Sequence, residues 1–201
     1  MKPGPLQQLV EFLSKPEWTT PVFWLLLVAS VAIAAAAWRR LPSQRGPRHL
    51  AIWLLRLAVG LMWWQGSLWK IPPDYGALVY WMKQIVDHAV IPLHGALVRD
   101  LVLPNIAVFG PAVYAVEAFI AVSLMLGFLT RLGALLGALM ALNLWFGLYS
   151  APGEWPWTYG FLIVIQCLFA LDPPGRSLGL DALMTGRVTR EGRIAPAGLP
   201  L

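Results

Sequence analysis

The sequence predicts an all-α integral membrane protein with about five transmembrane helices, since several apolar runs approach the roughly 17–25 residues that a bilayer requires. Hydrophobic residues make up 58% of the 201-residue chain and charged residues only 12%. Soluble domains average about 45–50% apolar and about 25% charged residues. Most of the surface is therefore expected to contact lipid, and the bilayer is the first partner that the sequence implies.

Five apolar runs are candidates for these helices, and they cover residues 21–38, 49–69, 105–129, 132–150 and 157–171. The alanine-rich end of the first run would suit cleavage of a signal peptide. However, a signal peptide has a basic leader, and here Arg39 and Arg40 follow the apolar run instead of preceding it. We therefore expect a retained, extra N-terminal transmembrane helix after an outer segment at 1–20.

Residues 74–104 are too polar to span a membrane and too apolar for a simple loop. Apolar residues recur at helical spacing between Tyr75 and Val90, and Pro92 then interrupts the pattern. We expect one or two amphipathic helices that lie along the outer membrane surface and cover the bundle.

Arginine and lysine positions predict the orientation of the chain. Arginines crowd the link at 39–48, the tight turn at Arg131 and the tail at 185–201. Placing these in the cytoplasm puts the N-terminus outside and the C-terminus inside, in the inner (plasma) membrane of a bacterium or archaeon. This asymmetry accounts for the net charge of +5, so no nucleic-acid partner is expected.

Few residues could hold a cofactor. With Cys167 as the single cysteine, the chain can form no intrachain disulfide, cysteine-ligated cluster or dithiol relay, and Cys167 itself is expected to pack in the core. There is no C-x-x-C-H haem motif, and the spacing between His88 and His94 does not place two metal ligands on one helical face. No metal site and no tightly bound cofactor are expected.

Two charged residues lie inside apolar runs, where a charge costs about 2.5–3.5 kcal/mol at the helix centre. Arg56 and Glu117 could pair to fix helix register, because pairing offsets part of this cost. Alternatively, Glu117 transfers protons or contacts a quinone carbonyl while Arg56 holds it ionised or binds an anion. Helix phases that keep the two residues apart are the remaining alternative. Asn143 is expected at a depth similar to that of Glu117, about 17 Å from the inner end.

Most tryptophans map to the outer half of the predicted bundle. They could form an interfacial aromatic belt, an outer pocket for a flat ring such as a quinone, or a docking surface for another subunit. His88 and His94 could be surface residues or could transfer a proton from a quinol at the outer rim.

A set of short motifs follows in a characteristic order. Arg56-x-x-x-Gly60 and Gly66-x-x-x-Lys70 share one apolar run, Glu117 lies in the next, and Gly127-x-x-Thr130-Arg131 follows it. The stretch Gly175-Arg176-Ser177-Leu178-Gly179-Leu180-Asp181 closes the series. In this arrangement the chain resembles the DoxX/DoxD membrane protein family. The resemblance implies a four-transmembrane-helix bundle within 49–184, to which the first helix and the outer amphipathic segment are additions.

The DoxD branch is associated with thiosulfate:quinone oxidoreductase, in which a second subunit accompanies the membrane subunit. The resemblance therefore implies the membrane subunit of a redox system that interacts with a quinone and with a partner subunit. The expected catalytic residues are Glu117, Arg56 and His88, and the expected quinone contacts are Trp63, Trp64, Trp69 and Asn143. The alternative is a non-catalytic accessory subunit of a larger respiratory or photosynthetic complex, so enzymatic activity is left open. A transporter is disfavoured because no repeated pair of discontinuous helices is visible.

Overall fold

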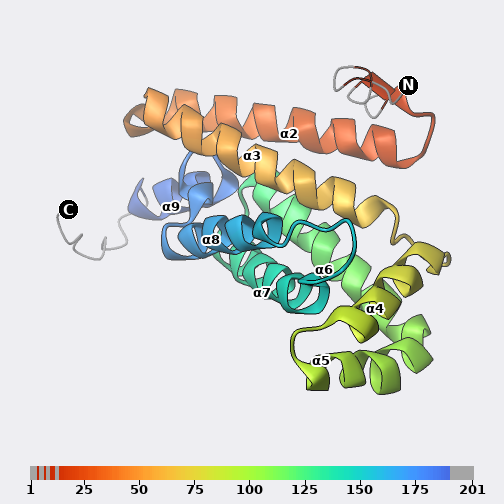
Figure 1. Ribbon diagram of the computed structural model, residues 1–201. Helices are drawn as coiled ribbons and strands as arrows, with labels where there is room; N and C mark the ends of the chain where they lie inside the picture. The colour runs from red at the N-terminus through yellow and green to blue at the C-terminus, as the bar shows by residue number, and fades with distance from the viewer. Residues whose placement is uncertain (1–3, 5–6, 8–9, 12–13, 191–201) are drawn as a thin grey trace.

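The computed structural model describes residues 4, 7, 10–11 and 14–190, and every regular element within them is helical. The principal helices are α2 (Thr19–Arg40), α3 (Pro47–Leu68), α4 (Gly76–His88), α5 (Pro92–Leu97), α6 (Ile106–Leu126), α7 (Thr130–Leu148), α8 (Trp157–Leu171) and α9 (Leu180–Arg190). The long helices form one bundle, with α9 at one end and the pair α4 and α5 at the other (Figure 1). We call these the α9 end and the α4 end.

Three helical stretches of the described chain are long and apolar enough to cross a membrane, namely Thr19–Arg40, Pro92–Leu126 and Thr130–Leu148. Helix α8 is apolar but has only 15 residues. Helix α3 has 22 residues and carries Arg48, His49 and Arg56, which lower its apolar character. Both nevertheless pack in the same bundle, so the chain is a multi-pass helical membrane protein, and the predicted fold class is confirmed.

Glycines let the bundle helices approach closely. A Cβ at Gly60 of α3 would lie only 3.0–3.2 Å from Met125 and the backbone of Ala121 on α6. On α7, a Cβ at Gly137 would lie 2.4 Å from the amide nitrogen of Gln166 on α8. These contacts join α3 to α6 and α7 to α8 as two tight pairs, in line with the role of small residues between membrane helices.

Helix α2 is attached to the bundle by a buried polar contact. The Ser30 hydroxyl donates a hydrogen bond of 2.6 Å to the carbonyl of Met125 and accepts one of 3.2 Å from the Trp53 indole. The opposite face of α2 exposes Leu25 and Val28. A hydroxyl bonded inside the apolar core fixes the helix in one position, because breaking that bond would leave polar groups unpaired.

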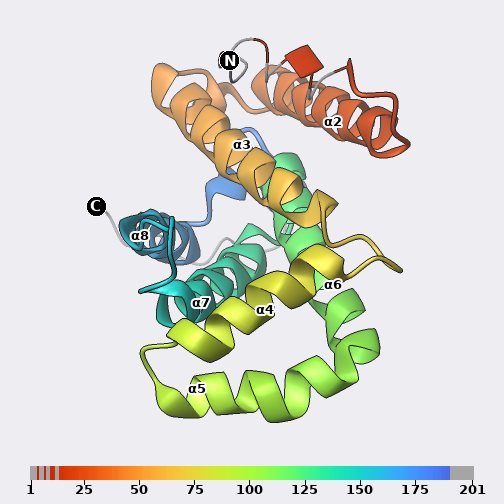
Figure 2. The same ribbon diagram turned by 45° about the vertical axis from the view of Figure 1, so that its right-hand side comes forward.

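The segment before α6 covers the α4 end. Leu78, Met82 and Ile85 on one face of α4 are buried, and they pack with Val98 and Leu148 in a cluster separate from the main core. Figure 2 shows α4 and α5 side by side across this end of the bundle. Helix α4, which has the amphipathic pattern, therefore packs its apolar face against the bundle. After α5 the chain continues through a π-helical turn (Val98–Val102) and a 3-10 turn (Leu103–Asn105) into α6.

Hydrogen bonds close the α9 end. The Asp181 carboxylate accepts bonds from the backbone N–H groups of Leu129 and Thr130, at 2.9 and 3.2 Å, and from the Thr130 hydroxyl at 2.8 Å. Its own N–H donates to the Gly127 carbonyl at 2.8 Å. The α6–α7 turn and the start of α9 are therefore held together, although their sequences are about fifty residues apart.

Most expected helices begin and end within a few residues of the observed ones, and the run at 157–171 coincides with α8. The tail helix α9 extends beyond the 184 boundary that we expected to end the ordered core. Of the expected tail, 191–201 lies outside the described residues, as does part of the segment 1–20. Cys167 is exposed on α8 and does not pack in the core as expected.

Gly127 offers a test of packing at the α9 end. Its φ of +71° is left-handed, and a Cβ there would lie 2.6 Å from Nη1 of Arg56 and 2.7 Å from Cα of Gly179. We predict that Gly127→Ala lowers the free energy of unfolding by about 2–5 kcal/mol through strain and overpacking. Thermal unfolding in detergent measures this loss. Gly66→Ala is the control, because nothing lies within 4 Å of its Cβ position, and it should stabilise α3 by about 0.5–1 kcal/mol. A Gly127→Ala protein as stable as wild type would contradict the packing described.

Candidate functional site

The bundle contains a cavity of about 360 Å³ at the α4 end. Residues from α3, α4, α6, α7 and α8 surround it, so it lies between the two tight helix pairs and beneath α4. Its lining is largely apolar, with Met82, Val113, Met140 and Leu162 among the contributors. A cavity of this size and character falls within the range of about 300–1,000 Å³ typical of small-molecule sites.

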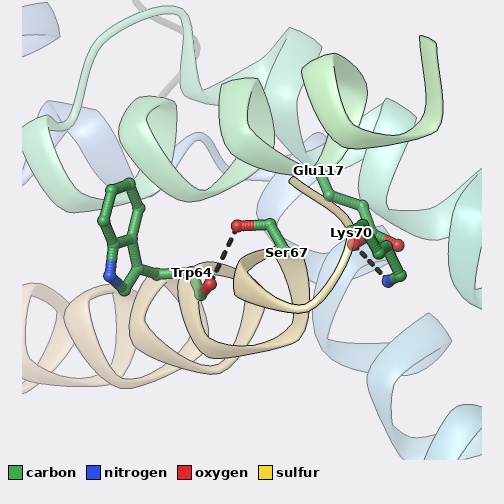
Figure 3. A network of polar contacts seen from close by, with 4 residues as sticks. All are labelled: Trp64, Ser67, Lys70 and Glu117. Atoms are coloured by element: carbon green, nitrogen blue, oxygen red, sulfur yellow. Dashed lines mark hydrogen bonds and ion pairs between the residues drawn. The ribbon is translucent and has the colours of Figure 1, made fainter. Parts of the chain in front are cut away.

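A buried ion pair is part of the cavity wall. The Lys70 ammonium, just past the end of α3, pairs with the Glu117 carboxylate on α6 (Figure 3). Lys70 is only 7% exposed and Glu117 only 2%. The ammonium also lies 4.2 Å from the centroid of the Trp69 ring, a cation–π contact that adds to its stabilisation.

The chain reaches this geometry because α3 ends just before Lys70. The Lys70 N–H bonds to the Ser67 carbonyl at 3.0 Å, and the Ser67 hydroxyl bonds to the Trp64 carbonyl at 2.8 Å (Figure 3). The following Pro72 and Pro73 cannot continue a helix ladder. The lysine side chain therefore starts at the helix terminus and is directed into the bundle toward Glu117.

Aromatic side chains form part of the wall. Trp63, Trp69 and Trp81 line the cavity together with Tyr159. The Tyr159 hydroxyl donates to Glu154 at 2.6 Å and is therefore occupied. The indole N–H of Trp63 is buried and has no acceptor within the described chain. A buried donor without an acceptor is costly, so this N–H lowers the stability of the wall without being accessible from the cavity.

Asn143 adds a polar group from α7. Its side-chain oxygen lies 3.0 Å from Nε2 of His94 on α5. With the proton on Nε2, the imidazole donates this bond and the amide NH₂ of Asn143 remains available as a donor toward the cavity that Asn143 lines. The cavity is thus bordered by side chains with donors on Lys70 and Asn143, whereas the Glu117 carboxylate is already paired. This donor-rich wall suits a flat ligand that carries hydrogen-bond acceptors.

The DoxX family profile matches residues 51–150, which include the Arg56, Lys70, Glu117 and Asn143 positions. The chain belongs to the DoxX family. No curated protein and no solved structure matches it. The matched residues supply most of the cavity wall, whereas α2, α8 and α9 of this DoxX protein lie outside the matched range.

The DoxX bundle brings four of the expected site residues together and separates the other three. Glu117, Trp63, Trp69 and Asn143 all line the cavity. Trp64 lies on the α2 side of α3, where it borders a separate cavity of about 250 Å³ with Thr19 and Phe23. His88 is not among the cavity residues, and its backbone carbonyl accepts a bond from Ser150 at 3.1 Å.

The expected contact between Arg56 and Glu117 does not form. Gly60 packs against the turn of α6 from Ala121 to Met125. Arg56 lies about one turn from this level toward the α9 end and Glu117 at least one turn toward the α4 end, so more than about 10 Å along the axis separates them. Arg56 is fully buried at the α9 end, where it donates to the carbonyls of Leu124, Met125 and Leu178. Its partners are thus backbone oxygens in the α6–α7 turn region and before α9, and Arg56 is a structural link rather than a cavity residue.

Lys70 is the main functional candidate that the sequence argument missed. From the sequence, Lys70 was assigned only a place in a family motif, whereas the structure pairs it with Glu117. The motif Gly66-x-x-x-Lys70 could have indicated Lys70 as a site residue, because both of its named residues line the cavity. Trp81 and Tyr159 were also missed as cavity residues, since one lies in the outer amphipathic segment and the other near the start of a short apolar run.

In the described part of this DoxX protein, no three or more His, Cys, Asp or Glu side chains gather as a metal site would require. The polar groups that line the cavity include one ion pair and the Asn143 amide.

The ion pair predicts a specific pattern of stabilities. Lys70→Met leaves the Glu117 carboxylate buried without a partner, which should lower the free energy of unfolding by about 3–5 kcal/mol. Combining Lys70→Met with Glu117→Leu removes both charges, so the double variant should recover to near the wild-type value or above it. Chemical unfolding in detergent compares the three proteins.

The control for this test is Lys15→Met, which breaks the exposed Lys15–Glu17 pair of 2.7 Å and should cost about 0–1 kcal/mol. If Lys70→Met were no more harmful than Lys15→Met, the Lys70–Glu117 pair would not be buried as described.

Proposed function

We propose that this DoxX protein is the membrane subunit of a redox system and binds a quinone in the cavity at the α4 end. The observation that carries the proposal is the combination of a buried Lys70–Glu117 pair with an aromatic, donor-rich wall. A quinone ring is flat and apolar, and each of its two carbonyl oxygens accepts hydrogen bonds. The wall offers aromatic surface to the ring and donors to the oxygens.

The cavity suggests distinct roles for its polar residues. The Lys70 ammonium donates to one carbonyl, and the Asn143 amide, oriented by His94, donates to the other. Reduction of the quinone to the quinol takes two electrons and two protons. Glu117 transfers one proton to the oxygen near Lys70, since a carboxylate in reach of the reacting oxygen is a suitable acid and base, and the second proton reaches the other oxygen from water. Arg56 and His88, which do not line the cavity, take no direct part in this proposal.

The electrons come from a reductant handled by a partner subunit. The resemblance to the DoxD branch suggests a reduced sulfur compound such as thiosulfate, two molecules of which lose two electrons and join through a new S–S bond. The quinone accepts these two electrons together with two protons taken from water, so the reaction balances. The DoxX chain contributes quinone binding and proton transfer, which are the tasks that its own side chains can perform.

The aromatic rim favours a second candidate function. Trp18, Trp155 and Trp157 are about 60% exposed. Such residues can anchor a chain at the membrane interface, and they can also dock it against a larger complex as an accessory subunit without catalysis. Purification in mild detergent separates these functions, since an accessory subunit would co-purify with a larger complex and bind no quinone by itself.

Filling the cavity is the most direct test of the proposal. Gly66 lines the cavity, and nothing lies within 4 Å of its Cβ position. We predict that Gly66→Leu weakens binding of a short-chain quinone at least about tenfold, because the added side chain occupies the space of the ring. Quenching of tryptophan fluorescence measures this binding on the purified protein. His88→Gln is the control, and it should bind the quinone as wild type does.

Asn143→Leu removes the proposed second donor and should weaken binding by about tenfold, the effect of losing one hydrogen bond to a buried partner. Glu117→Gln should retain binding but abolish turnover with the partner subunit. Equal quinone affinity in wild type, Gly66→Leu and Asn143→Leu would show that the quinone binds outside this cavity. No quinone binding by any of the three proteins would favour the accessory function.

A further inference from the structure

A groove at the α9 end contains two arginines that form no ion pair with any described residue. It has a volume of about 470 Å³ and lies between the first turns of α7, the turn at Pro173 and Arg176, and α9. Arg131 and Arg176 both line it and are both exposed. Neither belongs to any ion pair formed among the described residues. Among the described residues, the groove therefore holds two guanidinium groups that form no ion pair.

The acidic residue in the groove is already engaged. Asp181 lines it, but its two carboxylate oxygens accept the three bonds from Leu129 and Thr130 described above. Asp181 thereby accepts the hydrogen bonds donated at the start of α7, and it forms no ion pair with either arginine. Two guanidinium groups and one carboxylate leave the groove with an excess of one positive charge.

Both arginines are held in place by contacts that leave donors free. Nε of Arg131 donates to the Ala170 carbonyl at 2.9 Å, while its two Nη groups have no acceptor within the described chain. The Arg176 backbone carbonyl accepts a 2.9 Å bond from the Gln44 amide, which fixes the turn that presents its side chain. The planar N–H fork of a guanidinium matches the oxygens of a phosphate group.

An apolar stripe leads away from the arginines along α7. Leu132 and Leu135 line the groove and are 47% and 50% exposed, and Leu139 is 63% exposed. Their spacing of three and four residues puts them on one face of the helix. The stripe runs from the charged groove toward the middle of the bundle, as an acyl chain would below its headgroup.

We propose that this groove binds an anionic glycerophospholipid. The phosphate lies between Arg131 and Arg176, and an acyl chain follows Leu132, Leu135 and Leu139 on the lipid-facing side of α7. Basic pockets beside transmembrane helices recognise anionic headgroups in this manner. The leucine stripe favours a lipid over free phosphate, because inorganic phosphate would gain nothing from it. The site is independent of the quinone cavity, which lies at the opposite end of the bundle.

Native mass spectrometry of the full chain in neutral detergent tests the site with phosphatidylglycerol as the probe. The wild-type protein should bind phosphatidylglycerol more tightly than phosphatidylcholine. Arg176→Gln and Arg131→Gln should each weaken phosphatidylglycerol binding about fivefold, the effect of one arginine near an anionic lipid surface. The matched control is Arg48→Gln, an exposed arginine on the neighbouring α3, which should bind as wild type does.

A second set of measurements identifies the source of the phosphate. Leu135→Ser should weaken binding of phosphatidylglycerol, and an excess of inorganic phosphate should not displace the lipid. The Arg176 side chain makes no hydrogen bond within the described chain, so Arg176→Gln should keep the wild-type melting temperature without lipid. Unchanged lipid binding in Arg176→Gln and Arg131→Gln would overturn the proposal. If inorganic phosphate displaced the lipid and Leu135→Ser bound phosphatidylglycerol as tightly as wild type does, the proposal would be overturned in favour of a simple anion site.

Discussion

The contact between Lys70 and Glu117 places two opposite charges where water hardly reaches, and several parts of the structure are arranged around it. Two buried charges are tolerated only if each faces the other and their remaining surface is covered. Helix α3 ends so that Lys70 can extend into the bundle, the Trp69 ring covers the ammonium, and α4 packs over this end. The same arrangement leaves an apolar space beside the pair, and a ligand in this space would meet both the ammonium of Lys70 and the carboxylate of Glu117.

A second polar centre at the α9 end has a different character. Arg56 is fully buried, but it donates to carbonyl oxygens in the last turn of α6, where the helix itself supplies no further N–H partner. Helix ends expose such oxygens, so a buried guanidinium can satisfy several of them at once. Gly127 must lack a side chain for Arg56 to fit, and Asp181 completes the turn by binding the first N–H groups of α7. This centre joins structural elements, whereas the centre at the α4 end borders an open cavity.

The sequence predicted the helices well, because lipid-facing runs and their interruptions are visible in composition alone. It also predicted that Glu117 needs a partner, since an isolated carboxylate in hydrocarbon is too costly. It did not identify Lys70 as the partner of Glu117. Which residues of α3 and α6 meet depends on how far one helix is shifted along the other. The close contact at Gly60 fixes this shift, and no local sequence pattern reveals that contact. Trp63 and Trp64 were both predicted to contact one ligand, but they border different cavities. Adjacent residues of a helix point in directions about 100° apart, and the tryptophan content alone does not show which side faces which cavity.

Difference infrared spectroscopy on addition of a quinone would test the central claim most directly, because it follows the Glu117 carboxyl group itself. If a ligand meets the ion pair, the carboxyl bands should change when quinone is added to the wild-type protein. That change should vanish in Glu117→Gln and persist in Glu17→Gln, which alters a carboxylate outside the cavity. Bands that respond identically in Glu117→Gln and wild type, or that do not respond at all, would show that the buried pair is not part of a quinone site.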